Sequence, residues 1–387
     1  MWSRILGIGN NSSFIFGPRG VGKSTLLRQT LPQAKLFSLL QQSEYLRFLT
    51  NPSDFRREVL ALPRGSWIVV DEIQKIPALL DEIHAIMNEV GESHFHFAIT
   101  GSSARKLRKE NANLLAGRAR NRKLFPLVHA ELQFDTSQIE EILEFGTLPA
   151  VRTLSTPDRI QFLESYVATF LQQEIQQEAL AKHLDSFVRF LKVAALMNGQ
   201  LVNVSATARD SGVARTSVQG YFDILVDTLV GTWLPAWQPR AKVKETQHPK
   251  FYFFDPGVVR TITSQLRDGL DSVEKGFLLE TYIFHELRAA MEYQSLGGEL
   301  SYWRSGDREL DFIWTRGKVS VGIEVKSSER WKPEFASVGN ELVSKKILDA
   351  AFGVYLGEKA LVDGEMKVFP LIEFLTKVSA GKVLSRG

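Results

Sequence analysis

The stretch "FGPRGVGKSTLL", Phe16 to Leu27, decides the fold of the first part of the chain. Residues 17–24 match the pattern G-x-x-x-x-G-K-[ST] at every fixed position. The apolar run "SFIF" before them predicts a short buried strand, and a helical pattern follows them as far as Pro32. Glycine-rich turns of this kind direct backbone N–H groups toward phosphate oxygens at the amino end of a helix. The stretch therefore predicts a nucleotide-binding loop.

The side chains of this loop have separate expected roles. We expect Lys23 to reach the β- and γ-phosphates of ATP, and Ser24 to offer its hydroxyl to Mg²⁺. The whole loop is expected to surround the phosphates, and its nucleotide-binding residues are Gly17, Pro18, Arg19, Gly20, Val21, Gly22, Lys23, Ser24 and Thr25.

Length and composition limit the class of protein. The chain has 387 residues, a net charge of +3, 44% hydrophobic residues and no cysteine. We expect several domains, because this length exceeds one compact core. The lack of cysteine excludes disulfides, thiolate zinc sites and cysteine nucleophiles. No apolar run approaches the ~18 residues of a membrane helix, and the first residues lack a signal-peptide pattern, so we expect a cytoplasmic protein without membrane contact.

Two later apolar runs end in polar side chains. "SWIVVDEIQ" leads into Asp71 and Glu72, and "HFHFAITGSS" ends in Thr100 and Ser102. Ligands of open α/β sheets bind at the carboxyl ends of the strands. We expect Asp71 to hold the water shell of Mg²⁺, and Glu72 to polarise the water that attacks the γ-phosphate. Thr100 or Ser102 either orients that water or caps the next helix.

Two more apolar runs, "AKLFSLL" and "RKLFPLV", bring the expected strands to five, with helical segments between them. A parallel sheet flanked by helices is the natural packing of such a pattern. The first part of the chain is therefore expected to be an α/β domain.

Several motifs together resemble a known family. "GPRGVGKSTLL", "VVDEIQKIP", "ITGSSARKL", "AGRA" with "FPL", and "FYFFDPGVV" occur in this order. They resemble the AAA+ ATPases, and more closely the bacterial and archaeal ATP-binding proteins with a nuclease-like C-terminal domain. The resemblance covers nearly the whole chain and implies Mg²⁺-dependent ATP hydrolysis. It also implies that Arg118 contacts the γ-phosphate, in its own subunit or in a neighbouring one of a homo-oligomer, and that Gly146 and Pro149 begin a helical lid over the adenine.

The middle of the chain has the pattern of a helix-turn-helix. "VSATARDSGVARTSVQGYFDILVDTLV" predicts two helices with a turn at Gly212, and the later apolar runs "TWLPAW" and "KFYFF" predict the strands of a wing. The inner face of the second helix is expected to be lined by Val218, Phe222 and Leu225.

This winged-helix module has two interpretations. In a DNA major groove its outward residues would be Arg215, Thr216, Ser217 and Gln219. The alternative is a module that docks a protein partner. We favour docking, because only Arg215 is basic on that helix, and Asp223 and Asp227 follow. Residues 104–123, with eight basic residues and one acidic one, are either a solvated face or a phosphate contact.

The last part of the chain predicts a hairpin that carries acids and a lysine. Two runs of alternating polarity flank "TRGK", and pairing Trp314 with Val319 would put Asp311 opposite Gly322. Glu324 and Lys326 then lie on the face of Asp311, because strand side chains alternate. Asp311 and Glu324 are expected to bind Mg²⁺ or Mn²⁺, with Lys326 near a scissile phosphate. The pattern resembles the PD-(D/E)xK nuclease core, in which Glu280 would be the helical acid and a further metal ligand.

These expectations divide the chain into four parts. They are an AAA+ core at 1–145, a helical lid at 146–198, a winged-helix module at 199–267 and an α/β nuclease-like domain at 268–387. Three functions are compatible with this order. The first is an ATPase that moves or gates the C-terminal modules. The second is an ATP-dependent switch that acts through a protein partner, and the third is an ATP-gated nuclease that processes DNA.

Overall fold

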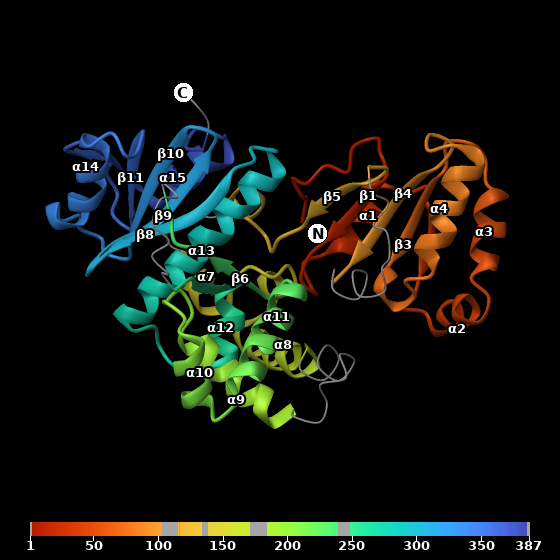
Figure 1. Cartoon of the computed structure of the whole chain (residues 1–387), viewed down its shortest axis with the longest axis horizontal. Coiled ribbons are helices and arrows are strands. Elements are labelled where there is room, and N and C mark those ends of the chain that lie inside the picture. Colours follow the sequence, from red (N-terminus) through yellow and green to blue (C-terminus); the bar gives the residue numbers. More distant parts are fainter. Residues whose placement is uncertain are drawn as a thin grey trace. The chain divides into compact units, whose positions relative to one another are not determined.

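The computed structural model describes residues 2–102, 115, 117–133, 138–170, 184–238 and 248–384 (Figure 1). The chain forms two compact units. Unit 1 comprises residues 3–126 and 227–229, and unit 2 comprises Trp2, residues 127–226 and residues 230–387. In the part of the chain that the structure describes, no helix is both long enough and apolar enough to cross a membrane.

A five-stranded sheet forms the centre of unit 1, and all its pairings are parallel. Its spatial order is β2-β3-β4-β1-β5. The strands are β1 (Ser13–Phe16), β2 (Lys35–Ser38), β3 (Trp67–Asp71), β4 (His96–Gly101) and β5 (Arg120–Lys123). This arrangement confirms the predicted α/β class. The fifth strand begins earlier than its apolar pattern indicated, because the edge position of β5 allows it to be polar, and the apolar residues after it leave the sheet.

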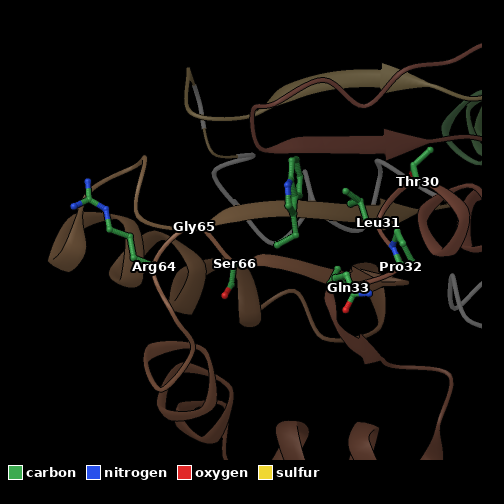
Figure 2. A pocket seen from close by; sticks show the side chains of 9 residues that line it. Thr30, Leu31, Pro32, Gln33, Arg64, Gly65 and Ser66 are labelled. Carbon is green, nitrogen blue, oxygen red and sulfur yellow. The ribbon is translucent and has the colours of Figure 1, made fainter.

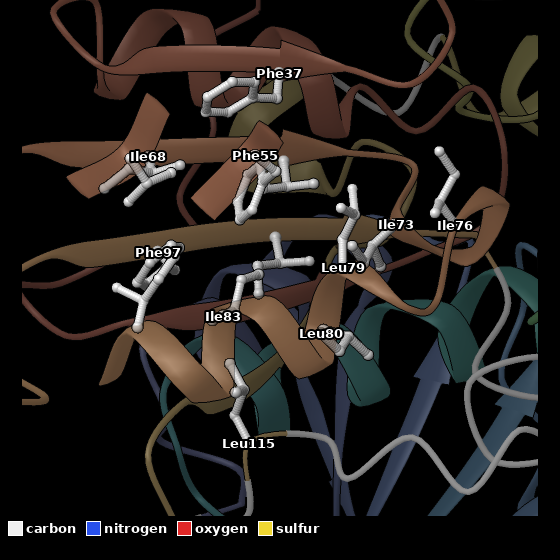
Figure 3. Packing of buried hydrophobic residues seen from close by; sticks show 14 of the residues in the cluster. Phe37, Phe55, Ile68, Ile73, Ile76, Leu79, Leu80, Ile83, Phe97 and Leu115 are labelled. Carbon is white, nitrogen blue, oxygen red and sulfur yellow. The ribbon is translucent and has the colours of Figure 1, made fainter. Parts of the chain in front are cut away.

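Helices cover both faces of this sheet. They are α1 (Lys23–Thr30), α2 (Gln42–Thr50), α3 (Ser53–Leu60) and α4 (Leu79–Val90). Side chains of α2, α3 and α4 pack with one face of the sheet in a single apolar core, where Phe37, Phe55 and Ile83 are fully buried (Figure 3). Because strand side chains alternate, the neighbouring residues of β2 and β3 face the opposite side, where α1 lies.

Unit 2 begins with helices. They are α6 (His129–Leu132), α7 (Ile139–Phe145), α8 (Thr156–Phe170), α9 (Leu184–Leu196), α10 (Val204–Ser211), α11 (Arg215–Asp227) and α12 (Pro256–Ile262). Between α11 and α12, the strands β6 (Gly231–Leu234) and β7 (Lys250–Phe253) pair antiparallel, and we call this pair the ribbon.

The two predicted helices and the turn between them at Gly212 are confirmed in α10 and α11. Gly212 ends α10 with φ 64°, a left-handed conformation that favours glycine. Val218, Phe222 and Leu225 are fully buried on α11. Their burial leaves the opposite face of this helix to the solvent: Arg215, Thr216 and Gln219 are exposed, and Ser217 is half-buried.

The second sheet lies in the C-terminal part of unit 2, in the order β12-β13-β11-β10-β9-β8. Its strands are β8 (Glu299–Ser305), β9 (Arg308–Arg316), β10 (Val319–Lys326), β11 (Ala350–Tyr355), β12 (Leu361–Asp363) and β13 (Met366–Pro370). The helices of this part are α13 (Ser272–Tyr293), α14 (Ser337–Ser344) and α15 (Leu371–Ser379). The β8–β9–β10 pairings are antiparallel, whereas β10, β11 and β13 run parallel.

The register predicted for the hairpin was wrong by two residues. Val319 pairs with Arg316, so the turn has two residues and not four, and Gly317 in it has φ 62°. Gly322 lies opposite Ile313 and not opposite Asp311. A Cβ at Gly322 would lie 2.6 Å from Leu310 Cδ2, so this glycine makes room for apolar packing and not for an ion. The two acids still come together, because the Asp311 carboxylate accepts a hydrogen bond from the backbone N–H of Val325, the residue after Glu324.

Candidate functional site

The phosphate loop joins the carboxyl end of β1 to the amino end of α1. Gly20 and Gly22 have φ values of 81° and 93°, a region that other residues rarely adopt. Gly17 is required for another reason, because a Cβ there would lie 2.3 Å from the carbonyl oxygen of Leu124. Among the other predicted loop residues, Pro18 and Val21 are buried, and Arg19 and Thr25 are exposed. The glycines therefore fix the path of the loop.

Lys23 is the first residue of α1, and its side chain turns back into the loop. Its Nζ donates hydrogen bonds to the carbonyl oxygens of Gly17 at 2.8 Å and Pro18 at 3.1 Å. The side chain is only 5% exposed. A buried ammonium group inside a glycine-rich loop is suited to phosphate binding.

Asp71 connects this loop to two strands of the sheet. It is 1% exposed at the end of β3, and its carboxylate accepts hydrogen bonds from Ser24 Oγ at 2.8 and 2.9 Å. Thr100 of β4 donates to the same carboxylate at 2.6 Å and accepts from the backbone N–H of Glu72 at 3.0 Å. Thr100 therefore positions the two acids. A hydroxyl and a carboxylate held together are the hard oxygen ligands that Mg²⁺ prefers, so these residues fit the ion.

Glu72 follows Asp71 in an unusual backbone conformation. Its φ is 64°, which is uncommon outside glycine and is found at functional sites. Gln74 Nε2 donates to its carboxylate and, at 2.9 Å, to Ser102 Oγ, and Ser102 lies 3.4 Å from the same carboxylate. Gln74 Oε1 is buried and has no partner among the described residues. Our sequence reasoning missed Gln74, although its position two residues after Glu72 could have suggested it.

Arg118 lies near the amino ends of the strands, whereas the phosphate loop lies at their carboxyl ends. Arg118 precedes β5, whose first residue, Arg120, pairs with Ser13 at the start of β1, whereas the phosphate loop follows the end of β1. Its guanidinium contacts Asn88 at 2.7 Å and Glu92 at 2.9 Å, near the carboxyl end of α4. A four-residue strand separates the two ends by about 13 Å. The structure therefore does not bring Arg118 to the phosphate loop of its own chain. Most of the basic run before it, residues 103–114, lies outside the described residues.

The predicted lid residues belong to unit 2. The carbonyl oxygen of Pro149 accepts a hydrogen bond from Trp2 Nε1 at 3.2 Å. Next to it, Thr147 donates its backbone N–H to Asp255 at 2.8 Å, and a Cβ at Gly146 would collide with that carboxylate. Asp255 also caps α12 through Val258. The start of the predicted lid and the quoted motif "FYFFDPGVV" thus meet at one buried carboxylate, Asp255.

Two pockets adjoin in unit 1. A pocket of 230 Å³ lies beside Ser24 and Asp71, and its apolar wall comes from α1, β2 and β3. A second pocket of 440 Å³ is lined by Leu31, Pro32 and Gln33 on one side and by residues 64–66 on the other (Figure 2). This larger pocket lies at the amino ends of β2 and β3, away from Asp71. Of these two pockets, the smaller one is lined by residues of the predicted nucleotide site, Ser24 and Asp71.

A second group of charged side chains lies in unit 2. We call Glu280, Glu309, Asp311 and Glu324 the acidic cluster. Asp311 is 5% exposed and accepts a hydrogen bond from the backbone N–H of Val325 at 2.7 Å. Glu324 Oε1 lies 2.5 Å from Lys326 Nζ, while Glu324 Oε2 is buried without a partner in the described part of the chain.

Two residues of β7 complete this group, and our sequence reasoning missed both. Lys250 Nζ lies 2.5 Å from Glu309 Oε1 and 3.6 Å from Glu280 Oε2. Tyr252 donates its hydroxyl to Glu280 Oε2 at 3.1 Å. A lone lysine at the start of the apolar run "KFYFF" was the available signal, because a cation in such a strand needs a buried partner.

The acids perturb one another. Burial, and after it the Asp311 carboxylate, raise the pKa of Glu280 to about 8. The same two causes raise the pKa of Glu324 well above its usual value. Burial alone would lower the pKa of Lys326, but the carboxylates, Asp311 foremost, outweigh it and raise that pKa. The cluster therefore holds more acid than its two lysines neutralise.

These residues fit a divalent cation only in part. Glu309 also pairs with Arg304, whose Nη1 lies 3.5 Å from Glu309 Oε2, so four carboxyl groups face three cations, and Glu324 Oε2 has no partner among the described residues. However, among the residues that the structure describes, no group of three or more His, Cys, Asp or Glu side chains is arranged to hold a metal ion. Asp311 and Glu324 come together as expected, whereas Glu280 contacts Lys250 and Tyr252.

Comparisons with known proteins agree with the geometry of unit 1. Residues 9–133 match the family model described as AAA domain. Residues 136–268 and 275–374 match two families described as Domain of unknown function (DUF8612) and Domain of unknown function (DUF4143). With its parallel sheet and its phosphate loop, unit 1 has the fold of a P-loop core of AAA+ type.

Similar proteins extend over the whole chain. An uncharacterized protein of Mycobacterium tuberculosis is 26% identical over 379 residues, which cover 96% of this chain and 80% of the relative. An uncharacterized protein of Haemophilus influenzae is 23% identical over 338 residues, which cover 80% of this chain and 81% of that protein.

Solved structures resemble this chain less closely. Thermotoga maritima RuvB, a Holliday junction branch migration motor, is 17% identical with a TM-score of 0.28, over 58% of this chain and 82% of RuvB. Aeropyrum pernix Orc1 in complex with DNA is 13% identical with a TM-score of 0.26, over 66% and 86% of the two chains.

Another buried carboxylate, Glu286, lies one and a half turns after Glu280 on α13. It is 2% exposed and accepts hydrogen bonds at 2.6 Å from the backbone N–H of His129 and from the Tyr282 hydroxyl. Burial raises its pKa from 4.5 to about 8. The folded chain therefore holds a proton on Glu286 that the unfolded chain has released between these two pH values.

We expect the stability that Glu286 contributes to be complete below pH 4.5 and to be lost as the pH rises to about 8. In Glu286→Gln the amide oxygen keeps both acceptor roles and cannot ionise. At pH 8.5 this variant should exceed the wild type in unfolding free energy by on the order of 3 kcal/mol. Urea unfolding at pH 5.5 and pH 8.5 measures the difference. Glu373→Gln, at an exposed position of α15, is the matched control, and parallel pH profiles of wild type and Glu286→Gln would contradict the expectation.

Proposed function

We propose that this protein binds MgATP at the phosphate loop and hydrolyses it, and that the nucleotide cycle moves or gates the segments that follow unit 1. The contact of Ser24, Asp71 and Thr100 carries this proposal, because it brings together, at the residue after the loop lysine, the oxygens that would hold Mg²⁺. The match of residues 9–133 to an AAA domain supports it.

Each side chain has a role in this reaction. Lys23 neutralises the phosphates, and Ser24 and Asp71 hold Mg²⁺, which supplies positive charge to the transferred phosphoryl group. Glu72 accepts a proton from the attacking water. Gln74 and Ser102 hold the Glu72 carboxylate in position, and Thr100 fixes its backbone. In the lid, Pro149 would contact the adenine.

Two variants separate binding from turnover. Lys23→Ala should lose MgATP binding in calorimetry, because the phosphate charge then lacks its buried cation. Glu72→Gln should keep the affinity and lose roughly 10²–10⁴ in hydrolysis rate, since an amide cannot accept the proton. Lys35→Ala, which removes an exposed lysine of unit 1, is the matched control. Equal affinity of Lys23→Ala and wild type would refute the assignment.

Because Arg118 lies away from the phosphate loop of its own chain, we propose that it acts on the γ-phosphate in a neighbouring subunit. Arg118→Ala should lower hydrolysis more than binding, because an arginine at the γ-phosphate acts on the charge of the transition state. If it acts across subunits, mixing inactive Arg118→Ala with inactive Glu72→Gln restores activity in part, as measured by steady-state phosphate release. If Arg118→Ala hydrolyses ATP at the normal rate, another residue must contact the γ-phosphate, and Arg120 is the next candidate.

One observation favours a second function, a metal-dependent action on DNA by the acidic cluster. Glu324 Oε2 is a buried oxygen without a partner among the described residues, beside the Asp311 carboxylate, which helps to raise the pKa of Glu324. In this proposal Asp311 and Glu324 hold Mg²⁺ or Mn²⁺, which supplies the Lewis acid, and Lys326 approaches the phosphodiester. Outward residues of α11, Arg215 among them, would contact either DNA or a protein partner.

Asp311→Asn tests this second function. We expect the wild type to bind Mn²⁺ and to cleave plasmid or single-stranded DNA with it, and we expect the variant to lose both, because half of the proposed metal site is neutralised. Calorimetry and gel electrophoresis provide the two measurements, with and without ATP. Asp307→Asn, in an exposed turn of the same sheet, is the control. Cleavage that survives in Asp311→Asn would come from another site or another protein.

A further inference from the structure

Strand β7 has two faces with different neighbours. On one face Phe251 and Phe253 face the helix-turn-helix segment, and the Phe251 ring lies 4.9 Å from that of Phe222 on α11. On the other face Lys250 and Tyr252 contact the acidic cluster. Alternation along a strand makes this division unavoidable, since consecutive side chains point to opposite sides. A single strand therefore touches α11 and the acids.

Both strands of the ribbon are attached to the C-terminal sheet at the end where Leu234 pairs with Lys250. Before residue 239, Tyr302 of β8 exchanges backbone hydrogen bonds with Pro235 at 3.0 Å and Trp237 at 2.6 Å. On the other side, the Tyr302 hydroxyl donates to the carbonyl oxygen of His248 at 2.5 Å. These contacts hold Lys250 where its Nζ reaches Glu309 and Glu280. Its side chain is only 4% exposed, so it cannot turn to the solvent without movement of the strand.

Lys250 and a divalent cation would compete for the same carboxylates. Lys250 lies 3.6 Å from Glu280, the acid that would complete a metal site made by Asp311 and Glu324. A buried ammonium group repels a second cation and also occupies an oxygen that the cation needs. The acids are thus partly neutralised by a residue that comes from outside the C-terminal domain.

We propose that Lys250 is the resident counter-ion of the acidic cluster, and that it lowers the affinity of the cluster for divalent cations while β7 is in place. This inference rests on the proposed metal-dependent function of the cluster. Lys250 is a positioning residue, because it acts through Glu280 and Glu309. Any ligand that displaces α11, whether DNA or a protein, would move Phe251 and with it Lys250, and would thereby free Glu280 for the metal.

Removal of the lysine charge tests the proposal on the full chain. We expect Lys250→Met and Lys250→Gln to bind Mn²⁺ at least about tenfold more tightly than the wild type, because one repelling charge is gone. Lys250→Arg should bind Mn²⁺ like the wild type. Lys318→Met, which removes an exposed lysine from the turn of the same sheet, should also leave the affinity unchanged. Calorimetric titration with MnCl₂ gives the affinities, and thermal unfolding shows that each variant is folded.

The possible results separate a failure of the proposed role of Lys250 from a failure of the proposed metal site. If the wild type binds Mn²⁺, and Lys250→Met and Lys250→Gln both bind it with the same or lower affinity, the proposed role of Lys250 is wrong. The metal site itself would then still be supported. Absence of Mn²⁺ binding in the wild type and in every folded Lys250 variant would overturn the metal site itself and the inference with it. If Lys250→Met does not fold, Lys250→Gln decides, since its amide retains hydrogen-bond donors for Glu309.

Discussion

The buried carboxylate of Asp71 is the interaction on which the nucleotide site depends. It accepts hydrogen bonds from the helix after the phosphate loop and from the neighbouring strand β4, and so it joins three segments of unit 1. A buried acid is costly unless it is paired and hydrogen-bonded, and the hydroxyls of Ser24 and Thr100 reduce this cost. The same oxygens are the ligands that Mg²⁺ would use, so one arrangement serves both stability and chemistry.

Glu72 depends on this arrangement as well. Thr100 holds its backbone N–H, and Gln74 and Ser102 hold its side chain, so the left-handed conformation is fixed from both ends. Arg118 lies outside this group, near the amino ends of the strands. The site in one chain therefore contains the groups that we propose to bind the phosphates and activate water, but not that arginine.

In the acidic cluster of unit 2, burial again makes charged carboxylates costly, but the outcome differs from that at Asp71. There the acids outnumber the lysines, and burial raises the pKa values of Glu280 and Glu324. Lys250 and Tyr252 reach Glu280 from a strand that also packs against α11. The charge of the cluster is thus tied to the position of the ribbon, which gives the middle of the chain a route to the C-terminal sheet.

The sequence by itself determined the features that depend on local spacing. The glycines and lysine of the phosphate loop, the apolar strands and the turn at Gly212 all follow from patterns within a few residues. Pairing across the hairpin did not, because a turn of two or four residues keeps the same alternation, and only the packing of Gly322 against Leu310 distinguishes the registers.

Contacts between distant segments were decided by the tertiary structure alone. The distance of Arg118 from its own phosphate loop, the meeting of Thr147 with Asp255, and the place of Lys250 among the acids each join residues that no local pattern connects. A lysine in an apolar strand signals that a buried partner must exist, because an unpaired charge is too costly to bury. Which carboxylate provides that partner depends on how the strands and helices pack.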